Sequence, residues 1–218
     1  MKNIKESSLN RKNFIFFEIL IAIVLLGMVI SCDSGVEPSP DPGMLRVTLQ
    51  ANPADTMVVL NQDTIYSDPR DSVNIKIFQG RVYRDSIFSF LYQNLDEYIQ
   101  EDHEYNLFNR GEDNNFKEFV VFESLLPPEN YNVLQFGIDA DFMLLTYGFF
   151  SGGIGIPIES SPDLSPLQVF NENIEINEGR ITEINLIIDP FQSVERYRDI
   201  FRFIPVIRVN SIKDVGSF

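Results

Sequence analysis

The alternation of apolar and polar residues along most of the chain is the feature that most constrains its fold. Leu45, Val47, Leu49 and Ala51 are separated by polar residues or arginine. This period of two places the apolar side chains on one face, as in a half-buried β-strand. Further segments with the composition of strands lie at residues 57–60, 64–66, 73–77, 81–83, 86–90, 116–126, 131–139, 142–150, 173–176, 181–189 and 201–209.

Turn residues separate these segments, and short strands at intervals of about 8–12 residues are typical of a β-sandwich or barrel. We expect Gln79-Gly80 to turn the chain, and residues 177–180 to close a tight hairpin in which Gly179 takes a positive φ. Pro205 cannot donate a ladder hydrogen bond, which indicates a sheet edge or a bulge. The sequence therefore predicts an all-β, mainly antiparallel fold.

One region departs from this pattern, at residues 91–115. Its apolar residues have the spacing of a short amphipathic helix, with Leu91, Leu95, Tyr98 and Ile99 on one face. The surrounding sequence is rich in Asp and Glu, and NRGEDNN at its end contains no apolar residue. We expect a short helical, acidic insertion that ends in an exposed loop.

The N-terminus contains a short apolar run, ILIAIVLLGMVISC, which ends in the single cysteine of the chain, Cys32. Four basic residues precede the run, as in a secretory signal peptide. Its end, Val-Ile-Ser-Cys, resembles the lipobox of bacterial lipoproteins, and this resemblance implies cleavage before Cys32 and lipidation of its sulfur. Two alternatives stay open: ordinary cleavage, and an uncleaved anchor, although a membrane span needs about 20 apolar residues and this one would include Glu18.

These features divide the chain into a signal peptide (1–31), a lipidated cysteine with a proline-rich tether (32–43), a β-sandwich domain (44–210) and a C-terminal tail (211–218). We expect the protein in the cell envelope, attached through Cys32 to a membrane outside the cytoplasm. Several acyl chains on one cysteine would hold it firmly, because each buried methylene contributes about 0.8 kcal/mol.

The charge of the chain excludes one class of partner. Without residues 1–31, 13 basic residues remain against 30 acidic ones, which gives a formal charge of −17. Such a protein repels phosphate backbones, so we expect no binding to nucleic acid. The unknown partner is expected to be a protein or a glycan.

The second half of the chain resembles the DUF4382 family of secreted bacterial domains, whose function is not established. The matching segments are Leu-Pro-Pro-Glu-Asn-Tyr at 126–131, Ile-Asn-Glu-Gly-Arg at 176–180, Ile-Ile-Asp at 187–189 with Ser-Val at 193–194, and Phe-Ile-Pro-Val-Ile-Arg-Val at 203–209. Gly43 and the four residues after it match the opening strand more loosely. The resemblance implies a transthyretin-like or immunoglobulin-like sandwich and supplies no catalytic residue.

Catalytic and metal-binding motifs are few. His103 is the single histidine, and no G-x-S-x-G motif accompanies it. A zinc site of the ordinary kind needs several His or Cys ligands, whereas His103 is the one such residue after the tether. We therefore expect no enzyme, no cofactor and no metal.

Two groups of oxygen ligands leave weaker possibilities open. Asp139 and Asp141 share a face if their strand continues, and a glycosidase needs two carboxyl groups at a defined separation. Calcium binds carboxylate and carbonyl oxygens, which both this pair and residues 112–115 could supply. Neither segment matches the D-x-D-x-D-G loop pattern.

Three functional hypotheses follow. The first is a lipid-anchored, non-catalytic envelope protein with a binding or structural role. The second is a carbohydrate-binding module of an envelope polysaccharide system, in which Tyr92, Tyr98 and Tyr105 stack on sugars. The third, more remote, is an envelope hydrolase that uses carboxylates such as Asp139 and Asp141.

Overall fold

The computed structural model describes residues 39–60, 63–93, 104–146, 153–160 and 167–218. Residues 40–218 form one compact unit. The described residues form strands and turns without an α-helix, so none of their elements is a helix long enough to cross a membrane. Outside them lie the expected signal peptide, Cys32, His103, Tyr98 and the rest of the predicted helix after residue 93.

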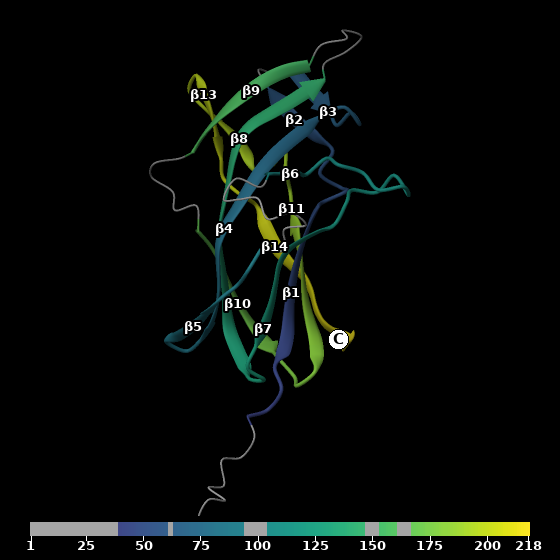
Figure 1. Ribbon diagram of the computed structural model, residues 1–218. Helices are drawn as coiled ribbons and strands as arrows, with labels where there is room; N and C mark the ends of the chain where they lie inside the picture. Colours follow the sequence, from purple (N-terminus) through teal and green to yellow (C-terminus); the bar gives the residue numbers. More distant parts are fainter. Residues whose placement is uncertain (1–38, 61–62, 94–103, 147–152, 161–166) are drawn as a thin grey trace, which may run out of the picture. The chain divides into compact units, whose positions relative to one another are not determined.

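The smaller sheet is organised around β1 (Gly43–Ala51), which has a neighbour on each edge. On one edge β1 runs parallel to β11 (Arg180–Ile188), and on the other it runs antiparallel to β7 (Phe119–Leu126). β14 (Ile207–Ser217) pairs with the far edge of β11. Figure 1 shows these strands side by side in the lower part of the molecule.

The larger sheet is organised around two long antiparallel strands, β4 (Ser72–Arg84) and β8 (Asn130–Thr146). The outer edge of β4 pairs with β5 and β6, the outer edge of β8 pairs with β9 and β10, and β13 and β12 extend the sheet beyond β9. The bounds of these strands are Ile87–Phe90 for β5, Glu104–Asn106 for β6, Gly153–Ser160 for β9, Leu167–Glu175 for β10, Val194–Tyr197 for β12 and Ile200–Phe203 for β13. A separate hairpin consists of β2 (Met57–Leu60) and β3 (Asp63–Tyr66).

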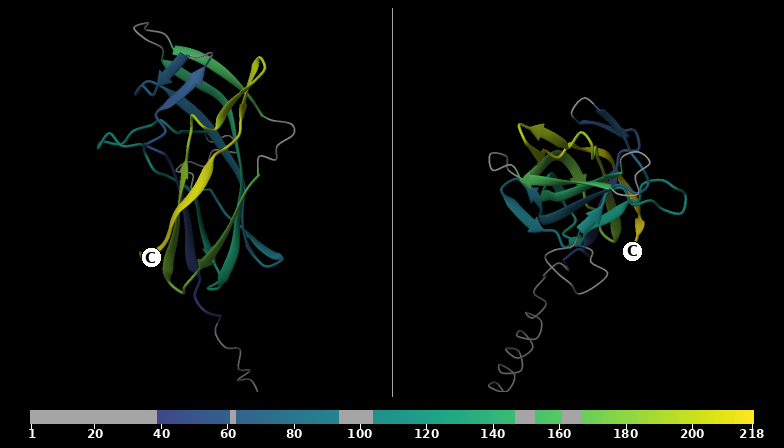
Figure 2. Two further views of the ribbon diagram at one scale, coloured as in Figure 1. Left: turned by 180° about the vertical axis from the view of Figure 1, so that it is seen from behind. Right: turned by 90° about the horizontal axis from the view of Figure 1, so that it is seen from above.

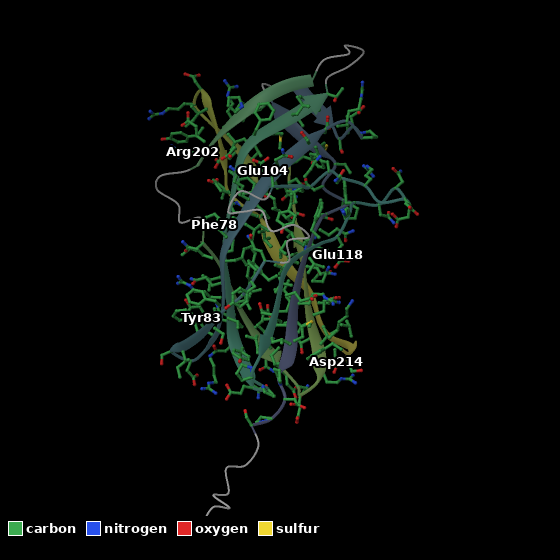
Figure 3. The ribbon with its side chains drawn as sticks, in the orientation of Figure 1. Phe78, Tyr83, Glu104, Glu118, Arg202 and Asp214 are labelled. Atoms are coloured by element: carbon green, nitrogen blue, oxygen red, sulfur yellow. The ribbon has the colours of Figure 1, made fainter. Side chains whose placement is uncertain are left out.

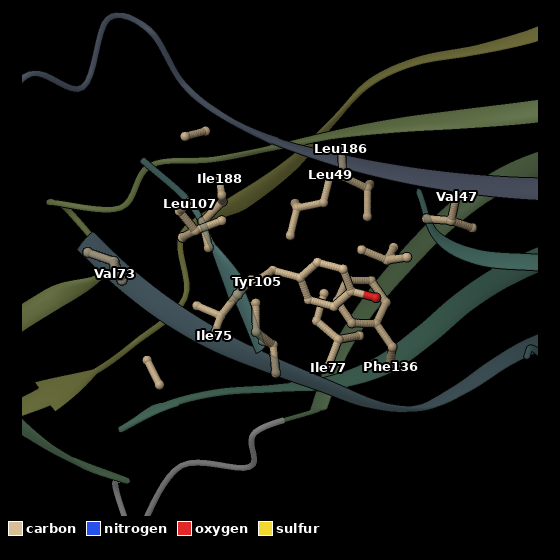
Figure 4. Packing of buried hydrophobic residues seen from close by; sticks show 14 of the residues in the cluster. Val47, Leu49, Val73, Ile75, Ile77, Tyr105, Leu107, Phe136, Leu186 and Ile188 are labelled. Carbon is tan, nitrogen blue, oxygen red and sulfur yellow. The ribbon is translucent and has the colours of Figure 1, made fainter. Parts of the chain in front are cut away.

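The two large sheets pack as the layers of a β-sandwich, which confirms the predicted all-β, mainly antiparallel fold (Figure 2). The alternating side chains Leu45, Val47 and Leu49 of β1 are fully buried between the layers. Phe122 of β7 meets Phe136 of β8 across the interface, with 5.9 Å between ring centroids. Figure 4 shows how side chains from both layers interlock. Burying each large apolar side chain stabilises the fold by about 1.5–3 kcal/mol relative to exposure.

The turn predicted at Gln79-Gly80 is wrong, because β4 passes straight through these residues. The pairing with β8 shifts between Phe78 and Arg81, so the two residues form a bulge rather than a loop. Gln79 has a φ of 54°. A Cβ on Gly80 would lie 2.5 Å from the ring of Phe122, so glycine is required here for close packing of the two layers.

The predicted hairpin around residues 177–180 and the predicted continuous strand at 201–209 are also wrong. At both places the chain passes from the larger sheet to the smaller one. Residues 177–180 form a turn, and Gly179 has the expected positive φ of 63°. However, β10 before this turn pairs with β8 and β11 after it pairs with β1, so they do not form a hairpin. Likewise the strand expected at 201–209 breaks at Pro205, between β13 of the larger sheet and β14 of the smaller one.

Residues 104–116 do not form a surface insertion. Tyr105, Leu107, Phe108 and Phe116 belong to the buried core, while residues 111–115 between them are exposed as expected. At the C-terminus, residues 211–217 continue β14 instead of forming a tail. Burial of the apolar residues explains the first difference, whereas residues 211–217 are held by their backbone pairing with β11.

The packing at the bulge generates a stability prediction. Gly80→Ala should lower the free energy of unfolding by about 1–3 kcal/mol, because its Cβ would overlap the buried Phe122 ring. Urea denaturation measures this change. Gly179→Asn is the control, since no atom lies within 4 Å of its Cβ position and Asn tolerates a positive φ. Equal stability of Gly80→Ala and the unmodified protein would contradict the packing described here.

Candidate functional site

The aromatic residues expected to bind sugar do not form one surface. Of the three, Tyr98 lies outside the described residues. Tyr92 is 72% exposed, but Tyr105 is only 4% exposed and packs against Phe119, with 5.4 Å between ring centroids. The prediction that Tyr105 is a surface residue is therefore wrong. Its place in β6 of the larger sheet, paired with Ile75 of β4, explains its burial.

Asp139 and Asp141 lie beside a lysine. Lys76 Nζ is 2.8 Å from Oδ2 of Asp141 and 3.6 Å from Oε1 of Glu104, and Asp139 is its neighbour in the ladder. Asp141 forms a bulge in β8: its neighbours Ala140 and Phe142 pair with Ile75 and Asn74 of β4, and Asp141 itself has no partner in the ladder. The ammonium group forms ion pairs with Asp141 and Glu104, which gives less support to a hydrolase that needs Asp141 free.

The acidic loop at residues 112–115 is closed by its own hydrogen bonds. The Asp113 carboxylate accepts hydrogen bonds from the backbone N–H and the side-chain amide of Asn115, at 3.1 and 2.7 Å. These bonds lower the pKa of Asp113. Across the ranges that the structure describes, no three His, Cys, Asp or Glu side chains converge as metal ligands would.

A buried polar network fixes the segment that follows β1. The Asp189 carboxylate accepts hydrogen bonds from Asn52 Nδ2 at 2.6 Å and from the Arg208 guanidinium at 3.0 and 3.1 Å. The Asp55 carboxylate accepts a hydrogen bond from the backbone N–H of Phe191 at 2.7 Å. These contacts tie the end of β1 to the connection between β11 and β12, so both carboxylates have structural roles.

An exposed aromatic cluster lies at the outer edge of β4. It consists of Arg81, Tyr83, Phe88 and Phe90, and we name it the β5 aromatic surface. Phe88 and Phe90 meet edge to face at 5.1 Å, and the Arg81 guanidinium lies 5.1 and 5.6 Å from their ring centroids. Phe88 and Phe90 are 42% and 57% exposed. Among the described strands β5 is the last one at this edge of the sheet.

This surface continues onto the larger sheet. The ring of Tyr83 lies 5.5 Å from that of Phe88, and its hydroxyl donates a 2.9 Å hydrogen bond to Oε1 of Gln135 on β8. Figure 3 shows Tyr83 on the outer side of the sheet, below Phe78. The surface thus combines ring faces with the polar groups of an arginine and an amide. Alternation in residues 86–90 indicated a strand, but it gave no sign that the strand lies at an edge.

A hollow of about 270 Å³ lies between the β2–β3 hairpin and the loop that joins β6 to β7. We name it the hairpin pocket. Figures 1 and 2 both show this loop projecting beside β2 and β3, far from β5. The residues lining the pocket are Pro53, Thr56, Tyr66, Ser67, Arg110, Asn115 and Phe116. Asp55, held by the buried network, lies between two of them in the chain.

The position of Arg110 in the hairpin pocket is set by two contacts. Its guanidinium lies 4.4 Å from the centroid of the Phe116 ring, and its Nη1 donates a 2.7 Å hydrogen bond to the carbonyl of Asn114. No carboxylate among the described residues forms an ion pair with it, and its buried Nε has no hydrogen-bond partner there. The buried Oγ of Ser67 likewise has no partner among the described residues.

No sequence pattern indicates this pocket. Ser67 follows β3, and Arg110 lies in a loop that is predicted to be exposed, in a region rich in Asp and Glu. Only the folding of residues 104–116 onto the core brings the two residues to one hollow. Whether these two polar groups find hydrogen-bond partners depends on how the chain folds around them, and the spacing of residues in the sequence does not reveal it.

Burial raises the pKa of Asp55, and the nearby charge of Asp189 adds to this effect, although hydrogen bonds from Phe191 and Gln192 oppose it. The folded protein therefore keeps the Asp55 proton to a higher pH than the unfolded chain does. Above pH 3.8, the ordinary value, the stability contributed by this group must fall as the pH rises through the folded pKa.

We accordingly expect Asp55→Asn to gain stability relative to the unmodified protein as the pH rises above 3.8, as measured by urea denaturation at several pH values. Asp113→Asn is the control of opposite sign: because the pKa of Asp113 is lowered, this variant should lose stability relative to the unmodified protein as the pH rises towards 3.8 and change little above it. A stability difference for Asp55→Asn that does not change with pH would contradict this prediction.

Comparison with known proteins finds no match for this chain. No family model matches the chain. No curated protein and no solved structure matches it either. The function therefore has to be inferred from the surfaces and contacts of the molecule itself.

Proposed function

We propose that this chain is a lipid-anchored, non-catalytic protein of the cell envelope with a binding or structural role. The N-terminal pattern that ends at Cys32, followed by the proline-rich tether, supports the anchor. The β5 aromatic surface is the observation that carries the binding role. Exposed aromatic rings beside an arginine have the composition of recognition surfaces, and such a patch is costly to leave in water without a purpose.

The non-catalytic character is supported by how the described carboxylates are used. Asp189 and Asp55 hold backbone and side-chain donors inside the fold. Asp141 pairs with Lys76. A catalytic carboxylate must be free to exchange a proton with a substrate or to attack it, and these groups have structural partners instead.

A second candidate function is carbohydrate binding, as in a module of an envelope polysaccharide system. The β5 aromatic surface favours it, because ring faces pack on the apolar faces of sugars while Arg81 and Gln135 offer hydrogen bonds. The formal charge of −17 after removal of residues 1–31 makes an uncharged glycan the preferred ligand of this surface. Tyr105 plays no part in this site, since it is buried.

The anchor is tested by intact mass spectrometry of protein extracted from membranes. The unmodified sequence should yield a species that begins at Cys32 and carries added acyl mass. Cys32→Ala should lack the added mass, because the sulfur that accepts the lipid is gone. A full-length, unmodified wild-type species would contradict the proposal and indicate an uncleaved N-terminal anchor.

The binding surface is tested by glycan-array binding of the full mature protein. Phe88→Ala combined with Phe90→Ala should lower binding about tenfold or more, because removing an aromatic anchor from a binding surface typically costs about 2 kcal/mol or more. The control is Tyr197→Ala, which removes a ring of similar exposure on β12. Undiminished binding by the double variant, or an array with no signal, would overturn carbohydrate binding at this surface.

A further inference from the structure

The hairpin pocket contains two buried polar atoms without partners among the described residues, Arg110 Nε and Ser67 Oγ. Buried polar groups are nearly always hydrogen-bonded, and each exception calls for an explanation. The folded protein has already removed these atoms from water. Both residues also line the hollow, so a turn of either side chain toward a ligand would let the buried atom form a hydrogen bond and recover free energy lost in folding.

Arg110 brings unused donors and a positive charge to the pocket. A guanidinium has five N–H donors and no acceptor, and among the described residues one hydrogen bond, to the Asn114 carbonyl, engages Arg110. The hydroxyl groups of Ser67, Thr56 and Tyr66, which both donate and accept, line the same hollow. The remaining guanidinium donors, with a charge that no described carboxylate pairs with, match a ligand rich in acceptors.

We propose that the hairpin pocket binds a carboxylate group on a ligand of about one small ring, with Arg110 and Ser67 as its main partners. Arginine recognises carboxylates with two parallel hydrogen bonds. The hollow of about 270 Å³ lies just below the usual range of about 300–1,000 Å³ for ligand pockets. Its size therefore favours a single unit, either an acidic sugar at the end of a glycan or a free organic acid.

The other stacked arginines provide a comparison. Arg81 and Arg202 also lie over rings and also have an Nε without a partner among the described residues. Stacking alone thus leaves an Nε unpaired and does not identify a site. At Arg110 the unpaired Nε coincides with a hollow and with a second unpaired atom, Ser67 Oγ, on its wall.

The acidic net charge of the protein does not prevent this contact. Charges further away than about 8 Å are largely screened at physiological ionic strength, whereas a partly buried pair is screened much less. In the loop, the carboxylate of Asp113 is engaged by Asn115, and no carboxylate of the described residues forms an ion pair with Arg110. The guanidinium is therefore available to an incoming carboxylate.

The test is equilibrium dialysis of the detergent-solubilised mature protein with D-glucuronate, D-glucose and N-acetyl-L-glutamate. Glucose has the ring of glucuronate without its carboxylate, so it should bind at least tenfold more weakly. Arg110→Gln should weaken glucuronate binding about tenfold or more, and Ser67→Ala should weaken it severalfold. Arg198→Gln is the matched control, because Arg198 also stacks on a ring, at 5.3 Å from the centroid of Tyr197, but does not line the pocket.

The two acids distinguish the source of the carboxylate. Binding of glucuronate alone assigns an acidic sugar, and binding of both acids assigns a small organic acid in general; either result supports the proposal. Equal binding of glucose and glucuronate, affinity for glucuronate that Arg110→Gln leaves unchanged, or no binding at millimolar concentration would overturn it. If Arg110→Gln fails to fold, Ser67→Ala and the comparison of ligands still decide the outcome. The β5 aromatic surface is separate from this pocket, so these results do not bear on glycan binding there.

Discussion

The pairing of β1 on both of its edges is the constraint on which the rest of the structure depends. β1 joins residues near the start of the described chain to β7 on one side and to β11 on the other. Its side chains Leu45, Val47 and Leu49 can be buried only when both neighbours and the opposite layer are in place. Because β11 lies far along the chain, the smaller sheet requires contacts of long sequence separation, which are typical of slowly folding β proteins.

The polar groups inside the molecule fall into two kinds. Asp189 and Asp55 have several donors each, and they attach the end of β1 to the chain after β11. Their burial therefore stabilises one conformation of the loops. Arg110 and Ser67 lie at the surface of that framework with atoms that have no described partner. The contrast separates groups that hold the fold from groups that a ligand could engage, and at the hairpin pocket two of the second kind line one hollow.

Strand positions could be predicted from the sequence because a period of two is a local property of the chain. Sheet membership could not, because the same alternation continues where the chain crosses from one layer to the other, as after β10 and at Pro205. Gly80 is a second example in which a local sequence pattern does not predict a contact between the layers. In sequence it indicates a turn, but in the fold it leaves room for Phe122 from the opposite layer. The many acidic residues near Tyr105 and Arg110 indicate an exposed insertion. The apolar residues among them, Leu107, Phe108 and Phe116, instead pack this segment onto the core.

The candidate site was accessible to sequence reasoning only in part. The exposed rings of the β5 aromatic surface lie within a segment that was predicted as a strand, yet alternation does not reveal which strand ends a sheet. The hairpin pocket joins residues after β3 to residues after β6. Pairs of that kind become neighbours only through the packing of other elements between them.

The position of β1 also determines how tension would travel through the molecule. The chain enters β1 at Gly43, after the proline-rich segment, and leaves it at Ala51, just before the first residues of the hairpin pocket. The β5 end and the pocket end of the sandwich lie apart in Figures 1 and 2, with the C-terminus nearer to the end at which β1 begins. A pull between the N-terminal segment and anything held near β2 and β3 would act along β1. Its hydrogen bonds run across the strand to β7 and β11, so the two ladders would be loaded in shear together rather than opened one bond at a time.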